Sequence, residues 1–260
     1  MLSTVWVTGA SSGIGRALAL ALARRGATVI ATARRVDELH GLATEAVGLR
    51  GRIHVEPGDV ADPMRMEAIV AAAEAAVGPI DTAVLNAGIY LPVQGTAFDA
   101  GAFRRCVDVN VMGTVYGLSA VLPRMVARGS GRVAIMGSLA GYGGVPASAA
   151  YGATKAALIN LAASLRMDLG GTGVIVQVIN PGFVATPRNA KSGSLPFMIP
   201  VDDAVERIIA GLASDRFEIA FPRRFALLLK AINLLPYPLY FALVRRTAGS
   251  TARRAASRID

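Results

Sequence analysis

Cysteine and histidine are scarce in this chain of 260 residues, and their scarcity narrows the chemistry available to it. The single cysteine, Cys106, excludes an internal disulfide and a cysteine-cluster metal site. The two histidines, His40 and His54, lie far from any acidic cluster with the spacing of metal ligands, so we expect no bound metal. We interpret Cys106 and His54 as structural residues.

A secretion signal is also not expected, because the segment STVWVTGASSGIG starts a strand at about residue 4. That start leaves no room for the basic and apolar regions of a signal peptide. We therefore expect a reducing, cytoplasmic location.

Acidic residues are scarce at one end of the chain only. Residues 221–260 contain eight arginines or lysines and a single acid, Asp260, which gives this segment +7 of the formal net charge of +9. The first 220 residues therefore carry about +2, and no basic patch is evident in them. The sequence does not indicate nucleic acid as a partner.

The remainder of the chain is apolar, with 53% hydrophobic residues, and short apolar runs alternate with helical periods. This alternation predicts an α/β fold, a doubly wound parallel sheet with helices on both faces, complete by about residue 190. The expected strands are Thr4–Thr8, Thr28–Ala31, Arg52–Glu56, Thr82–Leu85, Gly131–Met136 and Val174–Ile179, and the longest expected helices are Gly15–Arg25, Pro63–Val77, Ala102–Met125 and Ala150–Leu169.

The domain organisation follows from the same alternation. We assign residues 1–220 to one α/β domain and residues 221–260 to a basic, hydrophobic helical extension. Residues 187–200 have proline at both ends and glycine and serine between, which is typical of a mobile loop, and a helix resumes at 201–213.

A glycine-rich turn, VTGASSGIG, follows the first expected strand and opens the first helix. Glycine allows a tight turn and a close approach of a diphosphate, and the helix N-terminus adds N–H donors. The order Gly-x3-Gly-x-Gly after a first strand therefore predicts a dinucleotide site, although an ordinary strand–helix turn is the alternative. The expected contacts are Gly9, Ser11, Ser12, Gly13, Ile14 and Gly15.

The second expected strand ends in VIATARR, where NAD-selective sites usually have an acid. Thr32 occupies that position, and Arg34 and Arg35 follow. A guanidinium can bind a 2′-phosphate bidentately, so this pattern favours NADP(H), with NAD(H) as the other candidate. Two solvated arginines in a loop are the alternative interpretation.

The segment YGATK places Tyr151 and Lys155 four residues apart, on one face of an expected helix. A nearby ammonium favours the phenolate and lowers the pKa of a tyrosine from its free value of about 10. Such a tyrosine can exchange a proton with an alcohol or carbonyl. Ser138 ends an expected strand in IMGSLAG, where its hydroxyl can bind a substrate oxygen.

With these motifs the chain resembles the short-chain dehydrogenase/reductase family over roughly residues 1–190. The motifs follow in order: TGASSGIG (8–15), DV (59–60), NAG (86–88), NVMG (110–113), Ser138, YGATK (151–155) and PGFVAT (181–186). The resemblance implies a Rossmann-type fold and hydride transfer between a nicotinamide and a carbon that bears oxygen. It is the order of the motifs, and not any one of them, that makes the resemblance specific.

The resemblance also implies a role for each matching residue. Tyr151 would be the general acid/base, Lys155 would hold the ribose and tune the tyrosine, Ser138 would steady the substrate oxygen, and Asn110 would bind a water in a proton relay. The remaining implied cofactor contacts are Asp59 and Val60 at the adenine, Asn86, Ala87 and Gly88 beside the sheet, and Pro181, Gly182, Val184 and Thr186 at the nicotinamide and phosphates.

The substrate is harder to predict. The expected pocket residues are mostly apolar: Tyr90, Leu139, Tyr142, Val145, Phe183, Leu195 and Phe197. They favour a hydrophobic ketone, aldehyde or alcohol of lipid, steroid-like or aromatic type, while a sugar or an acyl-carrier thioester stays open. The alternatives to an enzyme of this kind are a non-catalytic NADPH sensor or scaffold and a peripheral membrane lipid reductase.

Two further features bear on partners. The helix expected after Tyr151 contains AALINLAASLRMDL, which is apolar on more than one side and favours a homodimer or tetramer.

The segment RRFALLLKAINLLPYPLYFALVRR, residues 223–246, is apolar between two arginine pairs. Pro236 and Pro238 should divide it into two short helices, roughly 223–234 and 238–247, and each would be too short to span a bilayer. Two interpretations stay open: packing over the pocket or a subunit interface, and peripheral contact with the inner face of a membrane.

Overall fold

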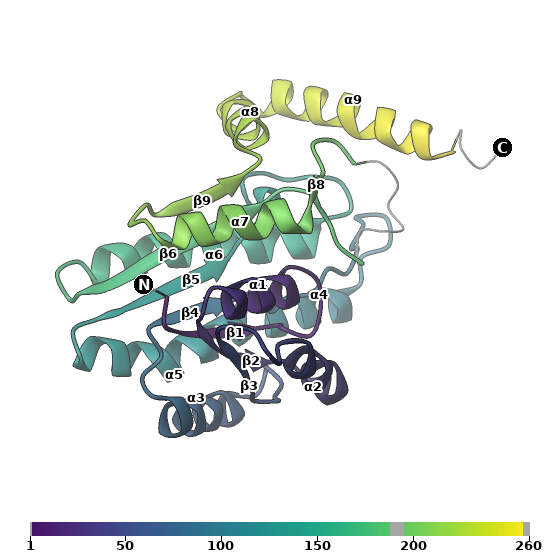
Figure 1. Cartoon of the computed structure of the whole chain (residues 1–260). Coiled ribbons are helices and arrows are strands. Elements are labelled where there is room, and N and C mark those ends of the chain that lie inside the picture. Colours follow the sequence, from purple (N-terminus) through teal and green to yellow (C-terminus); the bar gives the residue numbers. More distant parts are fainter. Residues whose placement is uncertain (1, 188–194, 257–260) are drawn as a thin grey trace.

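A seven-stranded parallel sheet forms the centre of the molecule (Figure 1). The computed structural model describes residues 2–187 and 195–256, with side chains as far as residue 246. The strand order is β3-β2-β1-β4-β5-β6-β9, and every neighbouring pair is parallel, which confirms the doubly wound α/β fold. The strands are β1 (Thr4–Thr8), β2 (Thr28–Thr32), β3 (Arg52–Val55), β4 (Thr82–Leu85), β5 (Gly131–Met136), β6 (Val174–Pro181) and β9 (Glu218–Phe221).

Helices cover both faces of the sheet, and alternate strand residues supply the two cores (Figure 1). Val5 and Val7 of β1 pack with α1, α2 and α7, whereas Trp6 between them packs with α3, α5 and α6. This is the period of two that a strand buried on both faces requires. The helices are α1 (Gly13–Arg24), α2 (Val36–Glu45), α3 (Pro63–Val77), α5 (Gly113–Ala127), α6 (Ala149–Asp168) and α7 (Val201–Leu212).

One long helix connects β4 to β5. It consists of α4 (Ala100–Cys106), the π-helical segment η1 (Val107–Met112) and α5, and it packs on α3 and α6. Among the described residues it is the one helix whose length and composition would allow it to cross a membrane, yet 44% of its most apolar window is buried inside the molecule. Leu118, Val121 and Met125 of this helix belong to the core on that face of the sheet.

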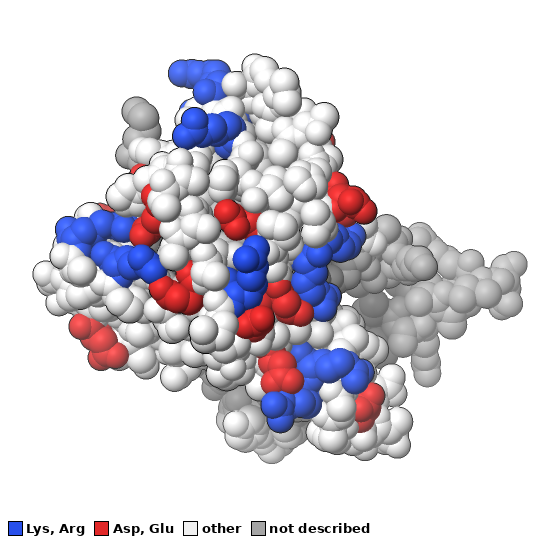
Figure 2. All heavy atoms as spheres, turned by 90° about the horizontal axis from the view of Figure 1, so that it is seen from below, with Lys and Arg blue, Asp and Glu red and all other residues white. Residues whose placement is uncertain are grey.

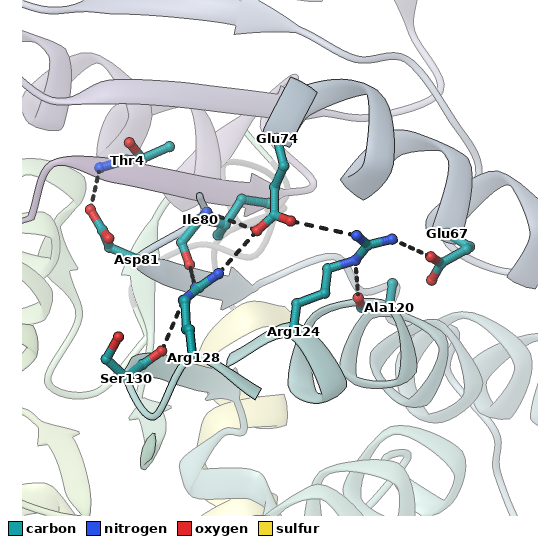
Figure 3. Close-up of polar contacts among 9 residues, drawn as sticks. All are labelled: Thr4, Glu67, Glu74, Ile80, Asp81, Ala120, Arg124, Arg128 and Ser130. Atoms are coloured by element: carbon teal, nitrogen blue, oxygen red, sulfur yellow. Dashed lines mark hydrogen bonds and ion pairs between the residues drawn. The ribbon is translucent and has the colours of Figure 1, made fainter. Parts of the chain in front are cut away.

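The amino ends of the central strands are closed by a polar network, which Figure 3 shows in close-up. Glu74 of α3 accepts hydrogen bonds from the backbone N–H of Ile80 at 3.0 Å and from Arg128 at 3.2 Å. Arg128 also donates to the backbone oxygens of Ile80 and Ser130, and Asp81 accepts from the N–H of Thr4 at 3.1 Å. These contacts tie the starts of β1, β4 and β5 together and leave the opposite, carboxyl edge for a ligand.

The strand order reverses between β1 and β4, because β2 and β3 lie on one side of β1 and the later strands lie on the other. At such a reversal the two following connections run to opposite faces and leave a crevice outside the carboxyl ends. The fold therefore places the expected ligand site beside Thr8 and Leu85, the last residues of β1 and β4.

The sheet does not end by residue 190 as the sequence predicts. The strand β9 pairs with β6 from Val178↔Glu218 to Pro181↔Phe221, so the boundary expected after residue 220 falls inside a strand. Its four residues, EIAF, are too few to display a strand period, and they form a strand because β6 offers them an open edge. The loop expected at 187–200 ends in β8 (Ile199–Pro200), paired with β7 (Val184–Ala185), and residues 188–194 lie outside the described residues.

The tail forms two helices, α8 (Arg223–Asn233) and α9 (Tyr237–Ala256), separated at Pro236 (Figure 1). The break lies where the sequence predicts it. The second helix, however, starts at Tyr237 and runs about nine residues further than expected. Pro238 does not delay its start, because a proline in the first turn of a helix costs no hydrogen bond.

Candidate active site

The glycine-rich turn has the backbone that its sequence predicts. Gly9 and Gly13 have positive φ angles of 71° and 56°, and α1 begins at Gly13. A Cβ at Gly15 would lie 2.4 Å from the oxygen of Gly9, and one at Gly9 would lie 2.9 Å from the Cα of Ala87. The turn is therefore packed against the NAG segment, and only glycine allows this approach. The free N–H groups at the start of α1 provide the donors that a diphosphate requires.

Asn86 fastens this turn to the end of β4. Its Nδ2 donates to the backbone oxygen of Thr8 at 2.9 Å, and the N–H groups of Asn86 and Ala87 donate to the hydroxyl of Thr8 at 3.0 and 3.1 Å. The contacts bridge the reversal between β1 and β4, where the sheet itself leaves a crevice. Both residues lie in motifs of the sequence, Asn86 in NAG and Thr8 at the start of TGASSGIG, but only Asn86 is expected there as a site residue.

The two arginines after β2 lie at the rim of the same turn. Arg35 donates to the hydroxyl of Ser11 at 3.0 Å, and Arg34 approaches Asp59 to 3.7 Å. Both guanidinium groups are more than half exposed. Asp59 also accepts from the N–H of Ala61, which fixes its loop. The structure thus brings Ser11, Arg34, Arg35 and Asp59 into one rim, with Val60 buried beneath it.

Tyr151 and Lys155 stand one turn apart near the start of α6. The Lys155 side chain is 3% exposed, and its Nζ donates to the backbone oxygen of Met136 at 2.6 Å and lies 5.6 Å from the centre of the Tyr151 ring. Because Met136 ends β5, this contact fixes the lysine against the carboxyl edge of the sheet. The ammonium and the phenol are therefore held close together inside a largely buried setting.

Ser138 lies two residues beyond the end of β5, on the same edge. Its hydroxyl accepts from the N–H of Ala140 at 3.1 Å and lies 3.3 Å from the backbone oxygen of Pro181, to which it donates. Pro181 ends β6 and starts the PGFVAT segment. This hydrogen bond joins the segment after β5 to the PGFVAT segment, which are far apart in the sequence. Further along PGFVAT, Thr186 returns to the glycine-rich turn, where a Cβ at Gly13 would meet its methyl group at 3.6 Å.

Asn110 lies in the π-helical segment η1 and is fully buried. Its Oδ1 accepts from the N–H of Ile89 at 2.7 Å, and its Nδ2 donates to the oxygen of Ile89 at 3.0 Å and to the hydroxyl of Thr154 at 3.1 Å. The amide thus joins the long helix, the segment after β4 and α6. A Cβ at Gly88 would lie 3.2 Å from this Oδ1 and 3.6 Å from the Nζ of Lys155. Because Gly88 has no side chain, both groups can lie against its backbone. Thr154 was not predicted from the sequence.

The expected pocket residues separate into two groups. Tyr90 lies beside Tyr151, with ring centres 5.4 Å apart in an edge-on arrangement, and Val145 is 40% exposed on the loop after Ser138. Phe183 and Phe197 both stack on Phe225 of α8, at 6.2 and 5.0 Å between ring centres. Leu139 is buried close to Gly182, and Leu195 is half-buried. Phe225, the aromatic centre of the second group, was not among the predicted pocket residues.

Tyr142 faces a polar cluster that the sequence did not predict. Its hydroxyl donates to Glu218 of β9 at 2.6 Å, and the same carboxylate accepts from Asn180 at 2.9 Å and from Lys230 of α8. The ammonium of Lys230 also lies 5.2 Å from the centre of the Tyr142 ring. We call Tyr142, Asn180, Glu218 and Lys230 the Glu218 cluster. It ties the loop after Ser138 to the last strand and to the tail.

The charge of Glu218 depends on its partners. Burial alone would raise the pKa of this carboxyl group, but the hydrogen bonds from Lys230, Tyr142 and Asn180 outweigh burial and hold the pKa below its usual value of 4.5. Burial, together with the neighbouring carboxylate, raises the pKa of Tyr142, which therefore stays a neutral donor. Burial also raises the pKa of Tyr90.

A family model for short chain dehydrogenases matches residues 3–195. The chain belongs to the short-chain dehydrogenase family. An uncharacterized oxidoreductase of Myxococcus xanthus is 40% identical over 247 residues, which are 94% of this chain and 96% of the relative. A Nostoc protein named ketoacyl reductase HetN is 35% identical over 182 residues, 70% of this chain and 63% of its own. As a short-chain dehydrogenase, the chain is an oxidoreductase whose family binds a nicotinamide cofactor.

Solved structures of short-chain dehydrogenases share the fold. The closed form of serine dehydrogenase in complex with NADP+ superimposes with a TM-score of 0.75 at 29% identity, covering 84% of this chain and 92% of that one. A short-chain dehydrogenase/reductase from Mycobacterium ulcerans gives a TM-score of 0.77 at 30% identity, covering 84% of this chain and 86% of its own. The glycine turn fits such a cofactor, because a Cβ at Gly9 or Gly15 would clash with the chain and the start of α1 has no side-chain cap on its N–H groups.

The Glu218 cluster makes the stability of the fold depend on pH. We expect Glu218→Gln to lower the free energy of unfolding at pH 7 by about 1–3 kcal/mol, because three donors lose a charged acceptor. Glu218 has a lowered pKa in the folded state, so its contribution is present above the unfolded pKa near 4.5 and is lost as the pH falls through the folded value. The difference between wild type and variant should therefore shrink below about pH 4.5 in urea titrations.

The matched control is Glu206→Gln, which removes the carboxylate from an ion pair with Arg25. The side chain of Glu206 is 62% exposed. We expect it to cost about 0.5 kcal/mol or less at pH 7. Equal losses in the two variants, or a Glu218→Gln deficit that does not change with pH, would show that the cluster does not stabilise the fold in this way.

Proposed function

We propose that the chain is an NADP(H)-dependent reductase that interconverts a hydrophobic ketone or aldehyde and its alcohol. The observation that carries the proposal is the placement of the Lys155 ammonium 5.6 Å from the ring centre of Tyr151, in a buried setting at the carboxyl edge of the sheet. A cation so close favours the phenolate, and a tyrosine tuned in this way can exchange a proton near neutral pH. Family membership supports the same roles.

The proposed chemistry divides the work between cofactor and protein. When bound, the nicotinamide supplies the hydride for the carbonyl carbon, and it accepts one in the reverse direction. Tyr151 gives its proton to the carbonyl oxygen, which yields the alcohol. The hydroxyl of Ser138 holds that oxygen by a hydrogen bond, and Lys155 stabilises the phenolate that remains on Tyr151. Asn110, beside Gly88 and Lys155, would hold the water through which the phenolate regains a proton.

The cofactor would lie along the carboxyl edge between the glycine turn and the PGFVAT segment. We assign the diphosphate to the backbone of residues 9–15, which follows β1 and opens α1. The adenine end would lie at Asp59 and Val60, and the nicotinamide end at Gly88, Tyr151 and Lys155. Pro181, Gly182, Val184 and Thr186 would complete the nicotinamide side, and Asn86 and Ala87 would line the floor.

The preference for NADP(H) is proposed from Arg34 and Arg35. Their guanidinium groups are exposed at the rim of the glycine turn, where Ser11 and Asp59 already orient them. A 2′-phosphate needs such charged donors, whereas a 2′-hydroxyl is usually held by an acid at the end of β2, where this chain has Thr32.

The apolar substrate is proposed from the aromatic wall of Phe183, Phe197 and Phe225, together with Leu139 and Val145. We also propose a cytoplasmic location, which agrees with a single, buried cysteine. A homodimer or tetramer through α6 is part of the proposal, because the small side chains of Ala153 and Ala157 are exposed on that helix. Light scattering in solution decides whether the chain is a monomer.

Substitution of the proposed acid tests the reaction. We expect Tyr151→Phe to lower kcat for apolar ketones and aldehydes by about 100-fold or more, since the proton donor is lost, with NADPH affinity nearly unchanged. NADPH absorbance measures turnover, and NADPH fluorescence measures binding. The control is Tyr116→Phe on α5, which removes a hydroxyl outside the proposed site and should leave kcat unaltered. Loss of NADPH affinity in Tyr151→Phe would assign a structural role to the tyrosine, and a wild type that binds NADPH without any turnover would point to a sensor.

Substitution of the proposed phosphate ligand tests the cofactor preference. We expect Arg34→Asp to reduce the ratio of kcat/KM with NADPH to that with NADH by about tenfold or more, because an acid repels the 2′-phosphate and can accept from a 2′-hydroxyl. Arg50→Asp makes the same charge change on an exposed arginine elsewhere and should leave the ratio unaltered. An unchanged ratio in Arg34→Asp would refute the assignment.

A further inference from the structure

The two tail helices expose an apolar surface that the fold leaves uncovered. Large side chains on α8, on α9 and in the turn between them are between 37% and 86% exposed. We call seven of them the outer face: Leu227, Leu228, Leu234, Leu235, Tyr237, Leu239 and Phe241. Elsewhere on the chain, single exposed apolar side chains such as Val47 and Met64 are scattered over different helices and loops. Exposed apolar side chains that gather within one short stretch of the chain, residues 227–241, mark an interaction site in a folded protein.

The opposite side of the same helices is fixed to the body. Ala226 and Tyr240 are buried, and the hydroxyl of Tyr240 donates to the oxygen of Gly144 at 2.7 Å. Lys230 binds Glu218, and Phe225 stacks on Phe183 and Phe197. These contacts hold the helices in one orientation, so the exposure of the outer face is a consequence of how they dock. The packing interpretation of the tail therefore accounts for one side of it only.

Positive charge borders the outer face at both ends. Arg223 and Arg224 start α8, and Arg245 and Arg246 lie beyond the apolar part of α9; all four are exposed. The sequence has no acid between residues 219 and 259, and Glu218 is already bound to Lys230. The body differs, since basic and acidic side chains lie next to each other on the face seen in Figure 2. Arg16 pairs with Glu45 and Arg25 pairs with Glu206 in this part of the protein.

We propose that the outer face binds the surface of an anionic lipid bilayer. An amphipathic helix with arginines beside its apolar side inserts that side at the boundary of headgroups and acyl chains, and the arginines bind anionic headgroups. Crossing the bilayer is not part of the proposal. The eleven residues of α8 extend about 16 Å, roughly half of the hydrocarbon thickness. The helix α9 has the length of a span, but Arg245 and Arg246 lie near its middle.

A second copy of the chain fits this surface less well. A two-fold contact would bring the same surface of both copies together and would place the four arginines of one copy against those of the other. With no acid in residues 219–259 to receive them, the like charges would repel. An anionic bilayer instead supplies both the apolar layer and the opposite charge. Charge complementarity therefore selects lipid as the partner.

Sedimentation with vesicles tests the proposal on the full chain. We expect the wild type to sediment with vesicles of phosphatidylcholine and phosphatidylglycerol and to bind those of pure phosphatidylcholine about tenfold or more weakly, with binding reduced by added salt. The variant L227Q/L234Q/L239Q removes apolar side chains that are at least 59% exposed, so it should fold normally and lose vesicle binding by about tenfold or more. The matched control, V47Q/M64Q/M167Q, changes three apolar side chains of the body that are at least 74% exposed, and it should bind like the wild type.

The charge requirement has its own pair of variants. R223Q/R224Q/R245Q/R246Q should lose binding to anionic vesicles, whereas R24Q/R50Q/R52Q/R207Q, with the same net charge but exposed arginines of the body, should keep it. Equal binding by the two variants of either pair would overturn the proposal. A wild type that does not bind the vesicles would also overturn it. If L227Q/L234Q/L239Q then also lowers the oligomeric state in light scattering, the outer face is a contact between copies of the chain. Because sedimentation needs neither cofactor nor turnover, this result is independent of the proposed reaction.

Discussion

The bridge between Thr8 and Asn86 is the contact on which the site depends. Thr8 ends β1 and Asn86 follows β4, the two strands between which the strand order reverses. Beyond these strand ends the hydrogen bonds of the sheet no longer connect the two segments. By accepting and donating across the gap, they set the distance between the glycine-rich turn and the NAG segment. Gly9 and Gly15 then allow the turn to close without a clash. The remaining groups, Ser138 with Pro181 and Lys155 with Met136, are fixed along the same edge by the ends of β5 and β6.

Much of this edge could be predicted from the sequence, because its signals are local. A strand followed by Gly9, Gly13 and Gly15 indicates a turn, and Tyr151 with Lys155 indicates a helical face. Within each pattern the residues lie only a few positions apart. The strand β9 and the Glu218 cluster could not be predicted in the same way. Tyr142 and Glu218 are 76 residues apart and meet only because β9 pairs with β6. Thr8, Thr154 and Phe225 were missed for the same reason, since their importance comes from partners that folding supplies.

The tail has two sides, and we assign to them the two roles that the sequence presents as alternatives. Its inner side completes the protein, since Phe225 extends the aromatic wall and Lys230 and Tyr240 hold the loop that follows Ser138. Its outer face is free of such contacts among the described residues and is bordered by arginine. If that face rests on lipid, the aromatic wall lies next to the membrane surface, which agrees with an apolar substrate. The Glu218 cluster is then the physical link between the tail and the segment that carries Ser138.

The central claim is that the carboxyl edge of the sheet, fastened at Thr8 and Asn86, is where the nicotinamide cofactor binds. Hydrogen–deuterium exchange of the full chain with and without NADPH tests this claim most directly, because it reports each backbone N–H separately. We expect NADPH to slow exchange in residues 9–15, 86–88 and 151–155, which converge on that edge, and to leave the amino-edge network around Glu74 and Arg128 unchanged. Protection confined to other segments, or none in residues 9–15 at saturating NADPH, would contradict it.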